Sequence, residues 1–222
     1  MRVKVLIVEG KTDEAFFKAL LENLYGFKRN DALIAKIPIG RHRPRGEVAH
    51  PLVLAKDDLA IVVQRAEGKQ RIPKIVKHLI NSMNLGILEL DGIFVVRDLD
   101  RESDVSNWIE GVRIYGMGKV SLGYENVEER RELELSIAYL AKLDGILDRY
   151  SRSISALRED KGEKLTPKDL MHLLSIAERY GGDCLSGLYE KYIGIMAHRN
   201  RELLLRFLSE IELLEFLEEL VR

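Results

Sequence analysis

The stretch VKVLIVEGKTDEAFF, residues 3–17, decides the fold of this chain. Its first part is an almost uninterrupted apolar run from Val3 to Val8, the pattern of a strand that is buried on both faces of a sheet. The strand ends at Glu9, and Thr12 is predicted to cap a helix that starts at Asp13. A strand followed at once by a helix is the first half of a βαβ unit, which predicts an α/β fold with a mostly parallel sheet.

Further apolar runs extend this pattern along the first half of the chain. Buried strands are predicted at 59–63 and 92–96, with a helix over 72–83 between them, and a fourth strand at 112–115. Residues 31–55 are predicted to form a basic insertion or edge hairpin, with strands at about 32–39 and 52–54. Pro38 keeps the first of these away from a central position in the sheet. We therefore expect a Rossmann-like domain over residues 1–122.

The second half of the chain is predicted to be entirely helical. Helices are expected over 125–150, from Thr166 to Gly181, and over about 184–197 and 200–221. The last of these is apolar on nearly every side, so it must be covered either by its own chain or by a second copy. We expect a helical C-terminal region over residues 123–222, and a homo-oligomer formed through the last helix is an open alternative.

Composition excludes several classes of protein. The 222 residues include 35 Lys and Arg against 36 Asp and Glu, a net charge of −1, so any contact with nucleic acid must use a local basic patch. A single cysteine excludes an internal disulfide and a multi-cysteine metal site, and favours a reducing, cytoplasmic setting. No apolar stretch approaches the ~20 residues that cross a membrane. Dense charge of both signs is a hint of a thermophilic source.

Acidic residues follow two of the predicted strands. Glu9 comes directly after the first strand, and Asp98 and Asp100 come after the strand at 92–96. The carboxyl ends of neighbouring parallel strands share one edge of a sheet, and side chains two apart on an extended segment point the same way. An isolated pair of this kind is more often a turn or a helix cap, but its occurrence together with Glu9 is more specific. Crowded carboxylates suit Mg²⁺ or Mn²⁺.

These residues resemble the Toprim (topoisomerase–primase) family. The resemblance lies in VLIVEGKTDEAFF (5–17) and IFVVRDLD (93–100), and it covers about residues 1–122. It implies a Toprim-like α/β fold, in which Glu9 is a general acid or base or a metal ligand. Asp98 and Asp100 are then ligands of Mg²⁺ for cutting or joining phosphodiesters. The wording around Glu9 is closest to small stand-alone and OLD-type nuclease Toprims, which makes Asp13, followed by Glu14, the candidate for placing a second metal ion.

The chain also departs from several branches of that family. Many Toprims have a glycine three residues after the aspartate pair, whereas Arg101-Glu102-Ser103 follows here, so the topoisomerase, primase and M5-ribonuclease branches fit poorly. The sequence has no zinc-binding cysteines, helix-hairpin-helix pattern or P-loop. These absences exclude RecR-like, primase-like and full-length OLD-like proteins. The small uncharacterised Toprim-related proteins of archaea and bacteria remain.

Basic residues near the acidic ones are candidates for binding nucleic acid. One cluster lies in the loop after Gly40 and contains Arg41, Arg43 and Arg45. A second follows Gly68 and contains Lys69 and Arg71, and Lys11 lies beside the predicted metal site. Such residues can follow a phosphate backbone by charge without reading sequence. A solvated surface loop is an equally good interpretation of the charge pattern.

Taken together, these features predict a divalent-metal-dependent enzyme that hydrolyses phosphodiesters of DNA or RNA. One alternative is a non-catalytic Toprim-like module that binds metal and nucleic acid within a larger complex. A third interpretation is a receiver-like phosphotransfer domain with Asp98 as the phosphoacceptor. It ranks last, because such domains need a pair of acids after the first strand and Glu9-Gly10 fits that less well.

Overall fold

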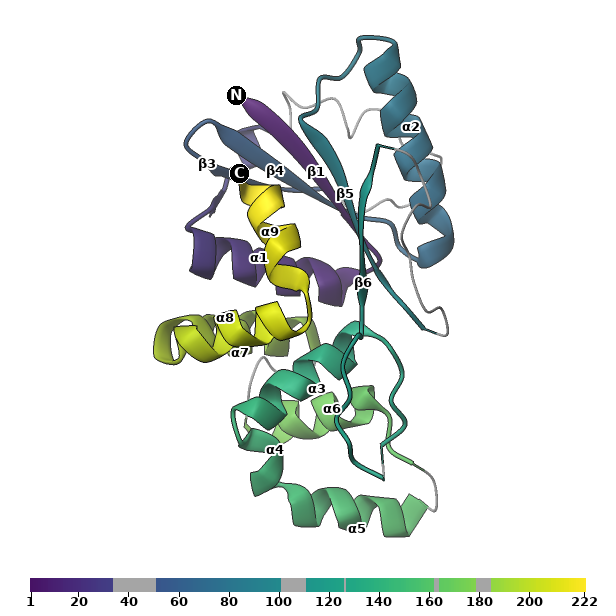
Figure 1. The fold of residues 1–222 in the computed structure, drawn as a ribbon, viewed down its shortest axis with the longest axis vertical. Coiled ribbons are helices and arrows are strands. Elements are labelled where there is room, and N and C mark those ends of the chain that lie inside the picture. The colour runs from purple at the N-terminus through teal and green to yellow at the C-terminus, as the bar shows by residue number, and fades with distance from the viewer. Residues whose placement is uncertain (34–50, 101–110, 126, 162–163, 179–184) are drawn as a thin grey trace.

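The computed structural model describes residues 1–33, 51–100, 111–125, 127–161, 164–178 and 185–222, side chains at 157–161 excepted. It contains a six-stranded sheet with helices on both faces and a group of helices below it (Figure 1). The strands are β1 (Arg2–Val8), β2 (Lys28–Arg29), β3 (Leu52–Lys56), β4 (Leu59–Arg65), β5 (Gly92–Asp98) and β6 (Arg113–Met117). The helices are α1 (Lys11–Tyr25), α2 (Ile72–Asn84), α3 (Leu133–Leu143), α4 (Ile146–Arg149), α5 (Ser151–Lys161), α6 (Pro167–Ala177), α7 (Leu185–Arg199), α8 (Arg201–Glu210) and α9 (Leu213–Val221), with short 3₁₀ turns η1 (Asp31–Leu33) and η3 (Lys69–Arg71).

The sheet is mostly parallel, as predicted. Its order is β2-β3-β4-β1-β5-β6, and β1 lies between β4 and β5 with both neighbours parallel to it. β3 pairs antiparallel with β4, and the two-residue β2 pairs antiparallel with β3. Leu52–Leu54 thus pairs back at the edge as expected. The strand predicted at about 32–39 begins instead in η1, and residues 34–50 lie outside the described residues.

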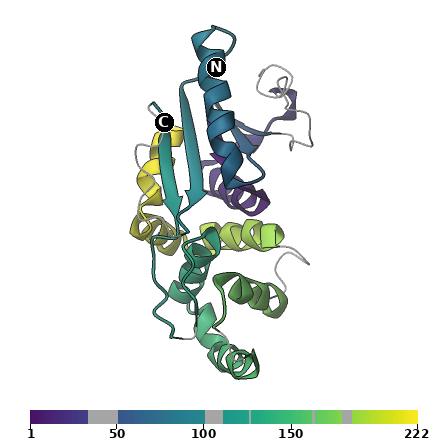
Figure 2. The ribbon, with the colours of Figure 1, turned by 90° about the vertical axis from the view of Figure 1, so that its right-hand side faces the viewer.

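Alternate residues of the central strands face two separate apolar layers. Leu6 and Val8 of β1 pack in the layer that contains α1 and the C-terminal helices. Val5 and Ile7 point the opposite way, into the layer covered by α2. Figures 1 and 2 show α2 on one side of the sheet and α1 with α9 on the other. Burial on both faces explains why β1 carries so few polar residues.

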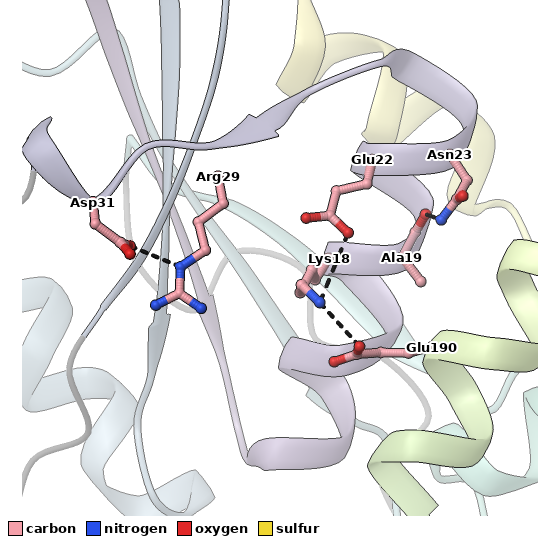
Figure 3. Close-up of polar contacts among 7 residues, drawn as sticks. All are labelled: Lys18, Ala19, Glu22, Asn23, Arg29, Asp31 and Glu190. Carbon is pink, nitrogen blue, oxygen red and sulfur yellow. Dashed lines mark hydrogen bonds and ion pairs between the residues drawn. The ribbon is translucent and has the colours of Figure 1, made fainter. Parts of the chain in front are cut away.

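The first helix is joined to the C-terminal half through α7. Lys18 Nζ of α1 lies 2.9 Å from Glu190 Oε2 of α7 and 3.7 Å from Glu22 Oε2 within its own helix (Figure 3). A Cβ atom at Gly194 of α7 would lie at an ordinary contact distance of 3.7 Å from the side chain of Asn23, so α7 and α1 lie against each other here. The helical half therefore packs directly on the sheet layer rather than apart from it.

The last helix covers the sheet of its own chain. The ring of Phe216 in α9 lies 5.5 Å from that of Phe94 and 5.6 Å from that of Tyr115, centroid to centroid. Lys4 Nζ donates a hydrogen bond of 2.7 Å to the Glu219 carbonyl. The N- and C-terminal ends lie near each other in Figure 1. The apolar residues that predicted a covering partner are thus buried within one chain, and a homo-oligomer stays a prediction without that support.

Two of the predicted helices are broken where the backbone turns left-handed. The helix expected over 125–150 is divided into α3 and α4 at Gly145, which has a φ of 70°. The helix expected over 200–221 is divided into α8 and α9 at Glu212, with a φ of 60°. By contrast, α6 starts as predicted, because Thr166 and Asp169 exchange hydrogen bonds in a capping box. Within the described residues no helix has the length and apolar character that a bilayer crossing requires.

Candidate active site

The ends of β1 and β5 meet through a direct hydrogen bond. The register pairs Ile7 with Val95, so Glu9 lies immediately beyond β1 beside the end of β5. The backbone N–H of Asp98 donates to Oε1 of Glu9 over 3.0 Å. The prediction that these two separate acidic segments lie side by side is confirmed.

Asp13 joins them from the first turn of α1. This helix begins at Lys11 with Gly10 as its N-cap residue, so the prediction of Thr12 as the cap was wrong. Asp13 is the third residue of the helix, and its Oδ2 accepts the N–H of Gly10 over 2.9 Å. Only 5 % of Asp13 is exposed, and its Oδ1 is buried without a hydrogen-bond partner among the described residues.

The helical half supplies a third edge of the site. Oδ1 of Asp98 accepts the backbone N–H of Leu133, the first residue of α3, over 2.9 Å. The carboxylate therefore sits at the partially positive end of that helix. Glu134 follows within the first turn and is also buried. Figure 1 shows α3 below the ends of the strands, where this contact joins the two halves.

Burial and crowding raise the pKa values of the carboxyl groups at this edge. Burial raises the pKa of Asp98 well above its usual value, and the negative charges of Asp13, Glu9 and Glu134 raise it further. Burial likewise raises the pKa of Asp13 to about 7, opposed by the Gly10 hydrogen bond and reinforced by Glu134 and Glu9. The pKa of Glu9 is also raised, and burial is the largest cause. Neighbouring carboxyl groups whose pKa values are raised by burial and by one another's charge are typical of functional sites.

The donor chemistry fits a hard divalent cation. Each of Glu9, Asp13 and Asp98 is oriented by a backbone amide on one oxygen, and Oδ1 of Asp13 has no partner in the described residues. A cation would relieve the repulsion among them, and carboxylate oxygens suit Mg²⁺ or Mn²⁺. In the arrangement seen, however, no three His, Cys, Asp or Glu side chains of the described residues are positioned to hold a metal ion. At least one further oxygen must move in to complete such a site.

Asp100 lies near this group but is turned toward a lysine. Its backbone is left-handed, with a φ of 50°, and its N–H donates to the Arg131 carbonyl over 2.9 Å. β5 ends at Asp98, so the extended geometry that predicted a shared direction for the two aspartates does not continue to Asp100. Its Oδ2 lies 2.9 Å from Nζ of Lys69, and 54 % of its side chain is exposed.

An open groove of about 600 Å³ adjoins Asp100. It is lined by Leu99, Gly118, Lys119, Val120, Ser121, Glu129 and Arg131. Its shape depends on Gly118, which has a φ of 85° and on which a Cβ atom would lie 2.3 Å from the backbone of Arg131. Only glycine permits this crossing of the segments after β6 and before α3. A groove at the carboxyl ends of parallel strands is the usual place for a ligand in an open α/β sheet.

Three of the predicted nucleic-acid-binding residues lie in described segments that follow β1 and β4. Lys11 is exposed at the start of α1, and Arg71 is exposed in η3. Lys69 precedes it in the same turn and pairs with Asp100. Arg41, Arg43 and Arg45 lie outside the described residues.

Sequence reasoning missed the acids supplied by α3. Glu132 and Glu134 belong to the segment ELELSIAYLA, where charged residues interrupt an apolar helix start. Burial raises the pKa of Glu132 to about 7, with the charge of Glu134 as the next cause. Tyr189 of α7 is fully buried beside them, and burial followed by the charge of Glu134 raises the pKa of its hydroxyl. A buried acid in an otherwise apolar helix was the available signal.

Comparison with known proteins finds a similar curated protein and a similar crystal structure. No family model matches it. The uncharacterised protein MJECL12 of Methanocaldococcus jannaschii is 31 % identical over 220 residues, which cover 86 % of this chain and 89 % of that protein. The crystal structure of hypothetical protein PH0156 from Pyrococcus horikoshii OT3 superposes with a TM-score of 0.90, at 56 % identity over the whole of both chains.

Proposed function

The chain belongs to the same family as protein MJECL12 of Methanocaldococcus jannaschii, and we propose that it hydrolyses phosphodiester bonds of nucleic acid with the help of a bound divalent cation. Residues 1–122 resemble a Toprim domain in the motifs around Glu9 and Asp98, and this resemblance supports the proposed activity. The hydrogen bond from the Asp98 amide to Glu9 carries the proposal, because it joins the two acidic segments that this chemistry requires.

The cation would be held by Asp98 and Asp100, with Glu9 and Asp13 adding carboxylate oxygens. The buried Oδ1 of Asp13, which lacks a hydrogen-bond partner in the described residues, supports this donor set. When bound, Mg²⁺ or Mn²⁺ supplies an activated water and neutralises negative charge on the phosphate oxygens. The backbone amides of Asp98, Gly10 and Leu133 keep three of the carboxylates in place before any ligand arrives.

Glu9 is the candidate for moving a proton. Its raised pKa brings it closer to neutral pH, where a carboxyl group can both accept and return a proton effectively. The Asp98 amide fixes Oε1, which leaves the carboxylate oriented at the edge of the sheet. We assign it the proton transfer to or from the attacking or leaving oxygen of the phosphodiester.

The cleavage test uses plasmid DNA, single-stranded DNA and RNA, each with Mg²⁺ or Mn²⁺. Wild-type protein is expected to cut at least one of these, and E9Q is expected to lose cleavage while its circular-dichroism spectrum is retained. E89Q is the matched control, because Glu89 is an exposed glutamate before the opposite end of β5. Equal cleavage by E9Q and wild type would overturn the assignment of Glu9.

The alternative is a module that binds metal and nucleic acid without turnover. Among the described acids no three ligands are already positioned for a metal ion, and this counts against an assembled catalytic centre rather than against weak binding through fewer ligands. Tight binding of nucleic acid without cleavage under any divalent cation would support this alternative over hydrolysis.

A further inference from the structure

Lys69 occupies an unusual place among the acids of this edge. β4 and β5 lie on either side of β1, and Lys69 follows β4 whereas Asp100 follows β5. The 2.9 Å contact between Lys69 Nζ and Asp100 Oδ2 therefore links the two segments that flank the end of β1. The side chain of Lys69 is 28 % exposed, which is low for a lysine in a surface turn.

The backbone fixes both ends of this contact. The N–H of Gly68 donates to the Glu9 carbonyl over 3.1 Å, so the turn that carries Lys69 is tied to the segment that carries Glu9. Asp100 is fixed from the other side by its N–H bond to the Arg131 carbonyl. Because these backbone segments are held, the side chains of Lys69 and Asp100 can change partners without moving the segments that carry them.

A carboxylate oxygen that is paired with an ammonium group is not free to ligate a cation. Asp100 is the acid of this group that is paired with a lysine, while Glu9, Asp13 and Asp98 accept backbone amides. Among the described residues no three acids are already placed to hold a metal ion, and Asp100 can join such a site only by leaving Lys69. If Asp100 turns to a cation, the ammonium of Lys69 stays at the same edge without that carboxylate to neutralise it.

We propose that Lys69 exchanges partners at this site: it competes with the divalent cation for Asp100, and once displaced it binds a phosphate of the nucleic acid. The inference rests on the proposed function, because it assumes that a cation is held beside Asp98. Binding of the cation and of the phosphate is then mutually reinforcing, since each favours the state in which the Lys69–Asp100 pair is open.

The first measurement is the affinity for Mn²⁺ alone, by calorimetry, in wild type and K69M. K69M is expected to bind Mn²⁺ about threefold to fivefold more tightly, the range for losing a partly exposed ion pair. In a D100N background the same change is expected to give no gain, which separates competition for Asp100 from a general charge effect. K77M is the matched control, because Lys77 is exposed on α2.

The second measurement is binding of a hydrolysis-resistant phosphorothioate oligonucleotide at several salt concentrations. K69M is expected to lower the salt dependence of log Kd by about one with Mn²⁺ present, because one phosphate contact is lost. In EDTA it is expected to change nothing, since Lys69 is then paired with Asp100. A purely structural role for Lys69 would not depend on the cation in this way.

The outcomes separate the two proposals. If wild-type protein takes up no Mn²⁺, both the proposed function and the exchange are overturned. If wild type binds Mn²⁺ but a folded K69M binds it no more tightly, only the exchange is overturned. An equal gain for K69M with and without D100N, or an equal loss of oligonucleotide binding in Mn²⁺ and EDTA, also overturns the exchange.

Discussion

The two ends of the same parallel strands carry charge in opposite ways. At the amino end, Arg2 Nε lies 3.2 Å from Asp58 Oδ2 and 3.8 Å from Asp91 Oδ2, and all three side chains are well exposed. At the carboxyl end, Asp13 is buried and Asp98 is partly buried, and burial raises the pKa of each. At the amino end, opposite charges pair where they are exposed. At the carboxyl end, several carboxyl groups lie close together with little exposure, and Lys69 and the buried Arg97 are nearby cations.

This contrast distinguishes a stabilising arrangement from a functional one. Exposed ion pairs contribute little to stability, but they cost little and are common on protein surfaces. Buried carboxylates that face one another disfavour the folded state, and proteins retain such conflicts mainly where a ligand or a reaction needs them. The carboxyl end is therefore where we place the activity.

The largest expected effect is on the rate of hydrolysis, and it should differ between the two aspartates at the opposite ends of β5, Asp98 and Asp91. D98N should lower the rate of nucleic-acid hydrolysis by about 10²- to 10⁴-fold, the range for removing a group essential to proton transfer or metal binding. D91N, at the other end of the strand, should leave the rate nearly unchanged. Initial rates on a fluorescent oligonucleotide test both variants. A D98N protein that is folded and fully active would contradict the contrast.

The next effect is on stability, with opposite signs at the two ends. D13N should raise the free energy of unfolding of the metal-free protein at about pH 8 by about 1–3 kcal/mol, because the amide keeps the Gly10 bond without the buried charge. D58N should be neutral or slightly destabilising, because it loses the exposed pair with Arg2. Urea unfolding in EDTA measures both. If D13N instead lowered the free energy of unfolding as much as the loss of a buried apolar contact does, the predicted cost of the buried Asp13 charge would be wrong.

The pH dependence follows from the same raised pKa values. Between about pH 4 and about pH 7 the unfolded chain ionises Asp13 while the folded protein keeps the proton. The folded state then binds more protons, so the metal-free protein should become less stable as pH rises through that window. Mg²⁺ should restore stability at about pH 8. Thermal unfolding with EDTA or Mg²⁺ tests this, and a rise in stability with pH in EDTA would contradict it.

The smallest effect is expected at the amino end. Arg113 Nε lies 2.6 Å from Glu219 Oε2, and both side chains are about half exposed. R113M should therefore cost only about 0–1 kcal/mol of stability and leave Mn²⁺ affinity unchanged. Urea unfolding and calorimetry would check the two results. A change in metal affinity would show that the two ends of the strands are not independent.

Local sequence patterns were sufficient for the elements that position the site. The apolar run of β1 and the turn at Glu9-Gly10 predicted a buried strand followed by a helix, and the run at Gly92–Val96 predicted β5. That the two strands are neighbours followed from the general order of open parallel sheets. The side-by-side placement of Glu9 and Asp98 could thus be predicted from the apolar runs and the strand order together.

The remaining parts of the site depend on contacts far apart in the chain. Glu134 enters because α3 donates its first amide to Asp98, 35 residues earlier, and no local pattern encodes that approach. Asp100 turns away with a left-handed backbone whose N–H bonds to the Arg131 carbonyl, 31 residues later. The break at Glu212 brings α9 back onto the sheet, where Phe216 contacts Phe94 and Tyr115, whereas propensity alone favoured a continuous helix.

The most direct test of the account is a crystal structure of the protein with Mn²⁺, located by its anomalous scattering. We predict one Mn²⁺ at the carboxyl ends of β1 and β5, ligated by Asp98 and by Asp100, with Lys69 no longer paired to Asp100. Mn²⁺ found only on exposed carboxylates such as Asp58, with the Glu9 and Asp98 edge still empty, would contradict it.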